Sequence, residues 1–430
     1  MNVWRCRKIR RAVALGIALF FPCAAAHAGQ VCPRLSVDIR ADGAVELLFR
    51  GNPGAPYQME RATSLVTGQW YAQTGQTSAT PVMSWVDAEP PWSSAFYRVL
   101  PTAEPFTPAQ LANAAEYSRT NSGAAVVVMQ NGSIVFEDYH NGADSNTATH
   151  IHSATKGFWS CALAAAIQEG LISGYDEVVS DTITEWQDTT NHPGKSLITV
   201  GHLAALASGL SQDVDYIQGT DPLASNIYDY VVNDLRVIYM PGTTFQYGPS
   251  HYYAFGVLLQ RKLALAGTPM NPLEYLQSRV LTPLGIEYVD WVQDDAGNPH
   301  IPNGCTLRPR QLIKLGRFLL QAGWWNDKAL IDSGRMTELR EAGGPNPGHG
   351  KFLWLNGQDG YPPAAKPPPP PDIEGGFIYY DGYTDIFAAL GAYGNRMFII
   401  PARNAVVVRQ APVPNYLWED TRFLAALLGE

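Results

Sequence analysis

Cysteine, positive charge and long apolar runs are all scarce in this 430-residue chain, and each scarcity excludes a class of protein. The five cysteines are too few for a disulfide framework and show no zinc-ligand spacing. No apolar run is long enough to span a bilayer as a helix. The 30 Lys and Arg face 39 Asp and Glu, which argues against a nucleic acid or an anionic membrane as partner. We also find no Gly-x-Ser-x-Gly elbow, His-Glu-x-x-His, phosphate loop or Gly-x-Gly-x-x-Gly, so no metal and no cofactor are expected.

The first 28 residues have the pattern of a secretory signal peptide. Basic residues between Arg5 and Arg11 precede a short apolar core that ends at Ala25, and Ala26-His27-Ala28 is a typical cleavage site. We therefore expect a secreted or periplasmic protein, cleaved near Ala28. Because residues 1–28 carry five basic and no acidic residues, cleavage would leave 25 Lys and Arg against 39 Asp and Glu, a formal net charge of −14. The cysteines left would be Cys32, Cys161 and Cys305.

Short strands dominate residues 29–101. The stretches 35–39 and 45–49 alternate in polarity around Asp42-Gly43, a hairpin signal, and further short strands follow. This spacing predicts a small all-β sandwich. Residues 57–100 resemble the fibronectin-type-III-like modules appended to exported bacterial enzymes. The simpler interpretation is a passive spacer; contact with a glycan or the cell surface through its tryptophans is the alternative. A proline-rich boundary over 101–108 precedes the second domain, 106–430.

The strongest chemical signal is His152-Ser153-Ala154-Thr155-Lys156, which holds the only Ser-x-x-Lys of the chain. At helical spacing the two side chains share a face, so the Lys156 amine can take the hydroxyl proton of Ser153. The following residues, to Gln168, are nearly all apolar and predict a buried helix, with Cys161 as a small core residue. An unpaired buried cation costs on the order of several kcal/mol. That cost favours catalysis over a structural lysine that reaches solvent.

Strands at both ends of the second domain enclose a helical middle. Asn131-Gly132 predicts a hairpin, and strands are expected again over 396–400 and 405–409. Helices are expected from Ser153, near 200–206, over 250–265 and over 308–321. This order predicts an α+β fold: an antiparallel sheet flanked by helices, with a helical subdomain.

Further motifs follow Ser153 and Lys156 in a characteristic order. Ile198-Thr199-Val200-Gly201-His202-Leu203 comes next, and the turn Pro241-Gly242 precedes Tyr247. Together they resemble the serine hydrolases of the β-lactamase and penicillin-binding-protein superfamily, specifically the class C β-lactamase-like branch with its esterases and D-aminopeptidases. The resemblance covers nearly all of 106–430 and implies a β-lactamase/transpeptidase-like fold. It also implies that Ser153 is the nucleophile and that Tyr247 shares the base role with Lys156.

Two motifs depart from that family. The second motif is Tyr-x-Asn in the family, but Pro249 stands in the asparagine position. Ser250 could replace the lost amide, although an N-cap is the favoured interpretation. The third motif is Lys-Thr-Gly or His-Thr-Gly in the family, whereas counting back from Pro401 gives Ala389-Leu390-Gly391 here. The glycine still allows close backbone approach, and by resemblance the amides of Ala392 and Ser153 form the oxyanion hole.

The missing cationic and hydroxyl side chains indicate the substrate class. In the family those groups hold a substrate carboxylate, so we expect an uncharged ester or simple amide of a small molecule, hydrolysed through an acyl-enzyme. The alternatives are a β-lactamase or D-Ala-D-Ala carboxypeptidase that uses another cation, such as Arg396, or a non-catalytic surface or cell-wall binding protein. The loop around Lys366–Pro371 predicts a polyproline II segment that either rims the pocket or is a solvated insertion.

Overall fold

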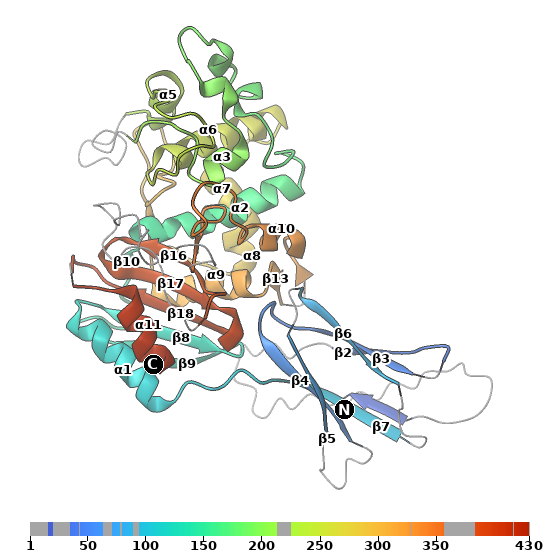
Figure 1. Cartoon of the computed structure of the whole chain (residues 1–430). Coiled ribbons are helices and arrows are strands. Elements are labelled where there is room, and N and C mark those ends of the chain that lie inside the picture. Colours follow the sequence, from blue (N-terminus) through green and yellow to red (C-terminus); the bar gives the residue numbers. More distant parts are fainter. Residues whose placement is uncertain are drawn as a thin grey trace. The chain divides into compact units, whose positions relative to one another are not determined.

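The computed structural model describes residues 16–19, 35–42, 44–62, 71–77, 80–88, 94–212, 225–326, 328–356, 383–415 and 417–429 (Figure 1). Two compact units divide the chain, the first built mainly on residues 1–105 and the second mainly on residues 106–430. No helix in the described residues is long and apolar enough to cross a membrane. The loop around Lys366–Pro371 and Cys32 lie outside these residues.

The first unit consists of two small sheets. One has the strand order β1-β7-β4-β5 and the other β2-β3-β6. Their bounds are β1 (Gly16–Leu19), β2 (Leu35–Ile39), β3 (Val45–Arg50), β4 (Pro56–Ala62), β5 (Tyr71–Thr77), β6 (Val82–Asp87) and β7 (Ser94–Pro101). Apolar side chains from both sheets form one buried cluster. Strand β1 falls within the expected signal peptide and pairs with β7, so cleavage near Ala28 would leave β7 at the edge of its sheet.

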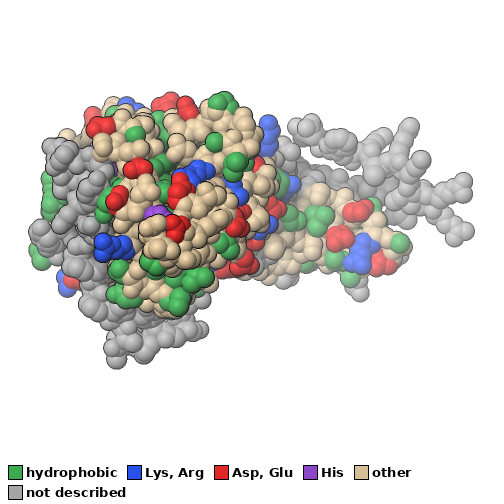
Figure 2. Space-filling model, turned by 90° about the horizontal axis from the view of Figure 1, so that it is seen from above, with side chains coloured by type: hydrophobic (Ala, Val, Ile, Leu, Met, Phe, Trp, Pro, Cys, Tyr) green, Lys and Arg blue, Asp and Glu red, His purple; other side chains and the backbone are tan. Residues whose placement is uncertain are grey.

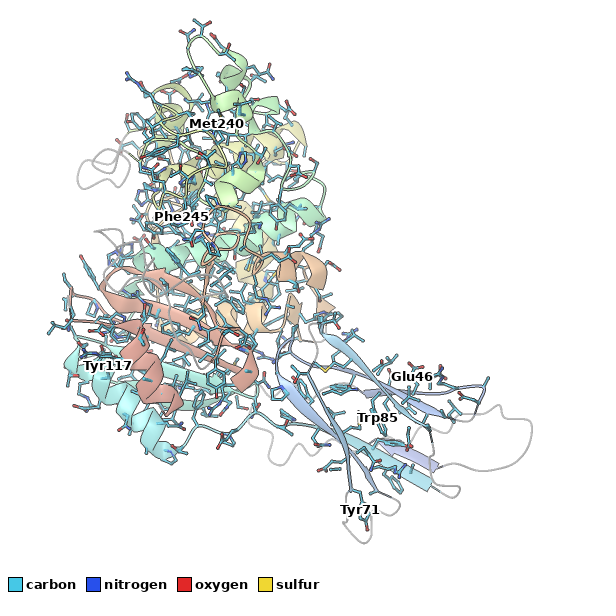
Figure 3. All side chains as sticks on the ribbon, viewed as in Figure 1. Glu46, Tyr71, Trp85, Tyr117, Met240 and Phe245 are labelled. Carbon is cyan, nitrogen blue, oxygen red and sulfur yellow. The ribbon has the colours of Figure 1, made fainter. Side chains whose placement is uncertain are left out.

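The aromatic residues of the first unit have different surroundings. Trp85 packs against the buried cluster, edge-on to Tyr97 with 6.0 Å between ring centres. Tyr71, at the start of β5, is 58% exposed (Figure 3). Trp70 and Trp92 lie outside the described residues. Of the tryptophans on which the glycan hypothesis rests, Trp85 is thus used in part by the core.

A six-stranded sheet is the centre of the second unit, with the order β15-β16-β17-β18-β8-β9. The strands are β8 (Ala125–Gln130), β9 (Ser133–Tyr139), β15 (Trp354–Leu355), β16 (Phe387–Gly391), β17 (Asn395–Ile400) and β18 (Ala405–Gln410). Strand β16 runs antiparallel to both β15 and β17. The first and last parts of the domain therefore meet in one sheet, as the sequence predicts.

Smaller sheets join β10 (Thr149–His150), β12 (Cys305–Leu307) and β11 (Asp290–Trp291), and β13 (Trp324–Trp325) with β14 (Lys328–Ala329). The helices are α1 (Pro108–Thr120), α2 (Lys156–Gln168), α3 (Val200–Ala204), α5 (Ile227–Asn233), α6 (Ser250–Leu265), α7 (Pro272–Leu276), α8 (Thr282–Leu284), α9 (Pro309–Leu320), α10 (Ser333–Glu338) and α11 (Asp420–Leu428). The expected α+β class is confirmed.

Helices cover both faces of the six-stranded sheet (Figure 1). Neighbouring residues of a strand point to opposite faces of the sheet. The contacts of Met397 and Phe398 in β17 therefore show which helices cover each face. A Cβ at Gly157 of α2 or Gly316 of α9 would lie 3.7 Å or less from Met397. On the other face, Phe398 stacks on Phe423 of α11 at 6.0 Å. A buried helix, α2, therefore lies directly against the strands that contain the third motif.

Local signals explain several of these elements. Thr107 and Gln110 form a capping box at the start of α1, where Pro108 takes the first helical turn. Asn131 and Gly132 have φ of 51° and 81°, the left-handed pair that a tight hairpin turn needs. The helix expected over 250–265 has these same bounds in the structure. The local residue pattern thus explains where these helices and this hairpin form.

Charge is distributed rather than concentrated on the visible surface. Figure 2 shows acidic and basic side chains interspersed among polar and apolar ones on one face. Basic side chains do not form a continuous patch on this face. The absence of a nucleic-acid partner stays a prediction.

Candidate active site

Ser153 lies in a short 3₁₀ turn, η1 (His152–Thr155), which leads directly into α2. A 2.7 Å hydrogen bond joins Ser153 Oγ and Lys156 Nζ, and Nζ also donates to the Pro302 carbonyl at 2.9 Å. Every residue of α2 from Lys156 to Ile167 is buried, because the helix itself carries small and apolar side chains on all of its faces. The two side chains singled out from the sequence are therefore in direct contact inside the domain.

Burial favours the neutral form of Lys156. Its side chain is only 6% exposed, and its hydrogen-bond partners among the described residues include no carboxylate. Burial holds the pKa of the ammonium well below its usual value, because the cation loses more hydration than the neutral amine. A neutral amine has the lone pair needed to accept the proton of the serine hydroxyl.

Two tyrosine rings lie beside the amine. The centres of the Tyr247 and Tyr252 rings are each 5.1 Å from Lys156 Nζ. Tyr247 is half-buried, as a group that meets substrate should be, whereas Tyr252 in α6 is fully buried. Burial raises the pKa of the Tyr252 phenol well above its usual value, so that hydroxyl stays protonated. The sequence singled out Tyr247 but not Tyr252, because α6 contains several aromatic residues that look alike.

An uncharged aromatic cluster extends from Tyr247. Its ring packs against Trp354 at a tilt, with 5.6 Å between ring centres, and Phe245 and His349 contact the same tryptophan. His349 is fully buried, and burial lowers its pKa to about 3, so the ring is neutral near pH 7. Phe245 is half-buried and marks the outer end of the cluster (Figure 3). The described side chains on this side of Tyr247 are therefore aromatic and uncharged at neutral pH.

The end of β16 touches the nucleophile turn. A Cβ at Gly391 would lie 2.1 Å from the Ile151 carbonyl oxygen and 2.9 Å from the Ala154 amide nitrogen. Only glycine allows this approach. Ala392 follows at once as the first residue of η7 (Ala392–Gly394). The structure thus brings Gly391 and Ala392 to the turn that holds Ser153.

The expectation that Ser250 is the N-cap of α6 is wrong. Pro249 occupies the cap position with helical dihedral angles, so Ser250 is the first residue inside the helix. The Ser250 hydroxyl is fully buried and donates to the Ser211 carbonyl, while its amide donates to Gln212 Oε1 at 3.0 Å. These bonds attach the 211–212 loop to α6. They give no support to a role for this hydroxyl in replacing the family asparagine.

Arg396 is not available to bind a substrate carboxylate either. Its side chain is fully buried and forms a 2.7 Å ion pair with Asp420 Oδ1 on α11. Its guanidinium also donates to the backbone carbonyls of Gly391 and Asn395. The hypothesis that this arginine holds the carboxylate of a β-lactam or a D-alanyl peptide is therefore wrong. All six residues of β17 are buried, so their polarity alone could not show which face an arginine serves.

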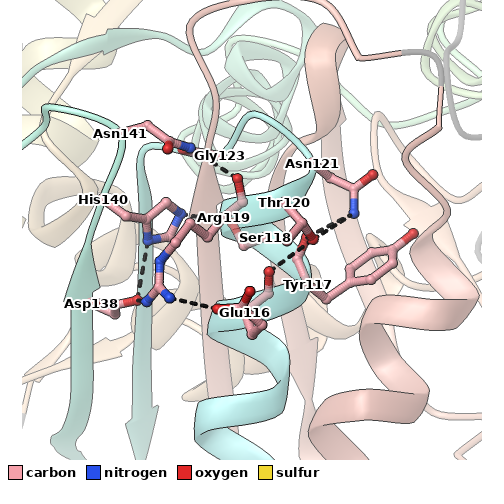
Figure 4. Close-up of polar contacts among 10 residues, drawn as sticks. All are labelled: Glu116, Tyr117, Ser118, Arg119, Thr120, Asn121, Gly123, Asp138, His140 and Asn141. Atoms are coloured by element: carbon pink, nitrogen blue, oxygen red, sulfur yellow. Dashed lines mark hydrogen bonds and ion pairs between the residues drawn. The ribbon is translucent and has the colours of Figure 1, made fainter.

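Apart from the Ser153 site, a serine, a histidine and an aspartate lie together between α1 and β9 (Figure 4). Ser118 Oγ is 3.3 Å from His140 Nε2, and His140 Nδ1 is 3.1 Å from Asp138 Oδ2. Ser118 is fully buried, and a Cβ at Gly123 would lie 2.1 Å from its Oγ. A carbonyl substrate has no room to reach this hydroxyl, so the group serves the fold and provides a useful control.

The cysteines among the described residues have the surroundings of core residues. Cys161 and Cys305 are free and buried, and burial raises the pKa of Cys161 to about 12, which suits a core residue rather than a nucleophile. Among the residues that the structure describes, no group of three His, Cys, Asp or Glu side chains could hold a metal ion.

The second unit is similar to a known protein family. The family model described as Beta-lactamase matches residues 109–411, which is most of the chain and nearly all of the second unit. The chain belongs to the beta-lactamase family. An uncharacterized protein of Alkalihalophilus pseudofirmus is 24% identical over 322 residues, covering 67% of this chain and 83% of that protein.

Solved structures share the fold. A putative 6-aminohexanoate-dimer hydrolase from Bacillus anthracis superposes with a TM-score of 0.56 at 19% identity, covering 73% of this chain and 79% of that chain. EstCE1, a hydrolase with promiscuous acyltransferase activity, gives 0.54 at 15% identity, covering 74% and 97%. At these identities the likeness shows the fold, and the expected β-lactamase/transpeptidase-like fold is confirmed.

Proposed function

We propose that this protein is an exported serine hydrolase that cleaves an uncharged ester or simple amide through an acyl-enzyme. The contact between Ser153 Oγ and Lys156 Nζ carries the proposal. A buried amine with a strongly lowered pKa, 2.7 Å from a serine hydroxyl, is the arrangement that activates a nucleophile.

The reaction follows from these positions. Ser153 Oγ attacks the carbonyl carbon while Lys156 Nζ accepts the hydroxyl proton. The negative charge then forms on the carbonyl oxygen, where the amides of Ser153 and Ala392 donate to it. Tyr247 passes the proton to the leaving group, which departs and leaves the acyl group on Ser153. A water molecule then attacks the acyl carbonyl carbon and gives up its proton to the same base, and Ser153 leaves with a proton as the free hydroxyl.

An uncharged acyl group fits the surroundings of this site best. The third-motif residues Ala389 and Leu390 carry no charge or hydroxyl, and Arg396 is already paired with Asp420. On the side away from Lys156, the Tyr247 ring contacts the uncharged Trp354 ring. Two fold neighbours are described as a putative 6-aminohexanoate-dimer hydrolase and a hydrolase with promiscuous acyltransferase activity, which is consistent with amide or ester chemistry.

Export belongs to the proposal as well. It rests on the signal-peptide pattern of residues 1–28. With cleavage near Ala28, the protein would act outside the cytoplasm on a small molecule, and the first unit would serve as a spacer or, alternatively, contact the cell surface.

Intact mass after incubation with a fluorophosphonate tests the nucleophile. We expect one adduct on the parent protein and none on Ser153→Ala, together with loss of p-nitrophenyl acetate hydrolysis in that variant. Ser118→Ala is the matched control, because it removes a serine whose hydroxyl also lies beside a basic side chain, His140. The proposal is wrong if Ser153→Ala keeps the adduct or the full rate, and an absence of adduct on the parent would favour a binding protein.

The substrate class needs a separate comparison. We expect saturable hydrolysis of p-nitrophenyl esters and no saturable hydrolysis of nitrocefin. The reverse preference would replace the esterase proposal by a β-lactamase.

A further inference from the structure

The backbone turn that follows β16 is held by side chains from neighbouring strands. Arg396 donates to the Gly391 carbonyl, and Asn395 Nδ2 donates to the Ala392 carbonyl at 2.8 Å. Arg409 Nη1 donates to the carbonyls of Tyr393 and Gly394, each at 2.8 Å. Four consecutive carbonyls, from 391 to 394, thus each have a buried side-chain donor.

The direction of one carbonyl fixes the direction of one amide. The Gly391 carbonyl and the Ala392 N–H belong to the same peptide unit, which is planar and in the trans form points them in opposite directions. A donor that holds the carbonyl on one side therefore holds the N–H toward the other. Because Gly391 packs against the Ile151–Ala154 turn, that orientation bears directly on the site of Ser153.

The turn needs such support because its backbone is strained. Tyr393 has φ of 63°, a left-handed conformation that costs a non-glycine residue free energy, and Gly394 follows at 76°. A rotation of the neighbouring 391–392 peptide unit would change the direction of the Ala392 N–H. Arg396 opposes it from a fixed position, since its Nε is bonded to Asp420 and both side chains are 1% exposed or less.

We propose that Arg396 is a positioning residue that keeps the Ala392 N–H directed at the oxyanion by holding the Gly391 carbonyl, with Asp420 anchoring its guanidinium from α11. The inference rests on the proposed function and extends it to a residue that does not touch the substrate. It gives a function to the buried pair of Arg396 and Asp420 next to the third-motif strand. The family resemblance leads one to expect a cation on that strand that contacts the substrate instead.

Two variants isolate the contact. Asp420→Asn removes the ion-pair charge but leaves the guanidinium able to donate to the Gly391 carbonyl. Adding Arg396→Met to that change removes the donor and leaves no unpaired buried charge at this position, so the double variant avoids the usual cause of destabilisation when one partner of a buried ion pair is removed. We expect kcat for p-nitrophenyl acetate to fall roughly 10-fold to 100-fold from the single to the double variant, with KM within about threefold, since a lost oxyanion donor costs about 10²–10³ in kcat.

Two further readouts separate positioning from stability. The inhibition constant of phenylboronic acid, which forms a tetrahedral adduct with the serine, should rise by a factor similar to the fall in kcat. The carbonyl stretching frequency of a slowly hydrolysed acyl-enzyme should rise in the double variant, because its oxygen loses a hydrogen bond. Asp294→Asn, a buried carboxylate that bonds the Ile227 amide, is the control for lost stability, and its kcat should stay at the parent value.

The outcomes separate the proposed role of Arg396 from the proposed serine hydrolase activity. If Ser153→Ala abolishes turnover but the single and double variants share one kcat and one boronate affinity, Arg396 does not position the amide and the serine hydrolase stands. If turnover survives Ser153→Ala, both the function and the inference fall.

Discussion

Two of the buried cations of the second unit, Lys156 and Arg396, have opposite environments. Lys156 is 6% exposed and has, among its described contacts, a hydroxyl, a carbonyl and two aromatic rings. Arg396 is fully buried and has the carboxylate of Asp420 as well as two carbonyls. Burial without a counter-charge lowers the pKa of an amine, whereas arginine keeps its proton in proteins, and Arg396 has the counter-charge of Asp420.

The difference suggests which buried cation reacts and which one holds structure. An amine without a counter-charge gives up its proton readily and can serve as a base. A guanidinium with a carboxylate is a permanent donor and can fix a backbone. On this view the two sides of the expected oxyanion site, the nucleophile turn and the end of β16, use buried charge for different purposes.

The largest test of the comparison removes the unpaired cation. Lys156→Met should lower kcat by roughly 10²–10⁴, because the general base is lost. The free energy of unfolding should stay the same or increase, because a group that is costly to bury has been replaced by an apolar one of similar length. Urea unfolding and p-nitrophenyl ester hydrolysis measure both quantities on one preparation.

Asp420→Ala is the matched opposite. It should destabilise the protein by roughly 3–5 kcal/mol, because it leaves Arg396 as an unpaired buried charge. A Lys156→Met protein that loses several kcal/mol of stability would show that the lysine is structural, and the contrast between the two cations would disappear.

The next test separates the two tyrosines beside Lys156. Tyr247→Phe should lower kcat by about 10², because the phenol that passes the proton to the leaving group is lost. Tyr252→Phe should change it by less than about threefold, since its hydroxyl is fully buried in α6 and the ring contact with Nζ remains. Equal losses in the two variants would mean that both rings act only by packing around the amine.

Much of this arrangement follows from local pattern. Ser-x-x-Lys before an apolar helix predicts both the contact and its burial, and counting back from Pro401 leads to Gly391, which does lie against the nucleophile turn. These predictions succeed because helical spacing and strand length are short-range properties. A glycine at a strand end is also informative, since close backbone approach has few other solutions.

The remaining features depend on contacts between distant parts of the chain. Pro302, whose carbonyl accepts from Lys156, lies 146 residues away, and no local signal marks it. Arg396 meets Asp420 only when α11 packs on the sheet. Ser250 has the sequence context of an N-cap, yet Pro249 already continues the helical turn and the hydroxyl is used by Ser211. The sequence pattern is thus a better guide to the reactive residues than to the distant residues that position them.

A buried histidine extends the same rule to pH and gives the smallest expected effect. His349 is buried like Lys156, and burial lowers its pKa to about 3, although its Nδ1–H donates to the Gly350 carbonyl at 2.9 Å. The unfolded chain takes up this proton near pH 6.5 and the folded protein does not. The unfolded state therefore binds more protons between about pH 6.5 and pH 3, and stability is lost as the pH falls through that window.

His349→Phe should remove this dependence. Each such histidine contributes at most about 1.4 kcal/mol per pH unit, so the difference in unfolding free energy between pH 7.5 and pH 5.0 should shrink by about 2 kcal/mol in the variant. Above pH 7 the stability gap between variant and parent should not change with pH, which serves as an internal control. An unchanged difference would mean that His349 titrates alike in the folded and unfolded states, and that burial alone does not remove charge in this cluster as it does at Lys156.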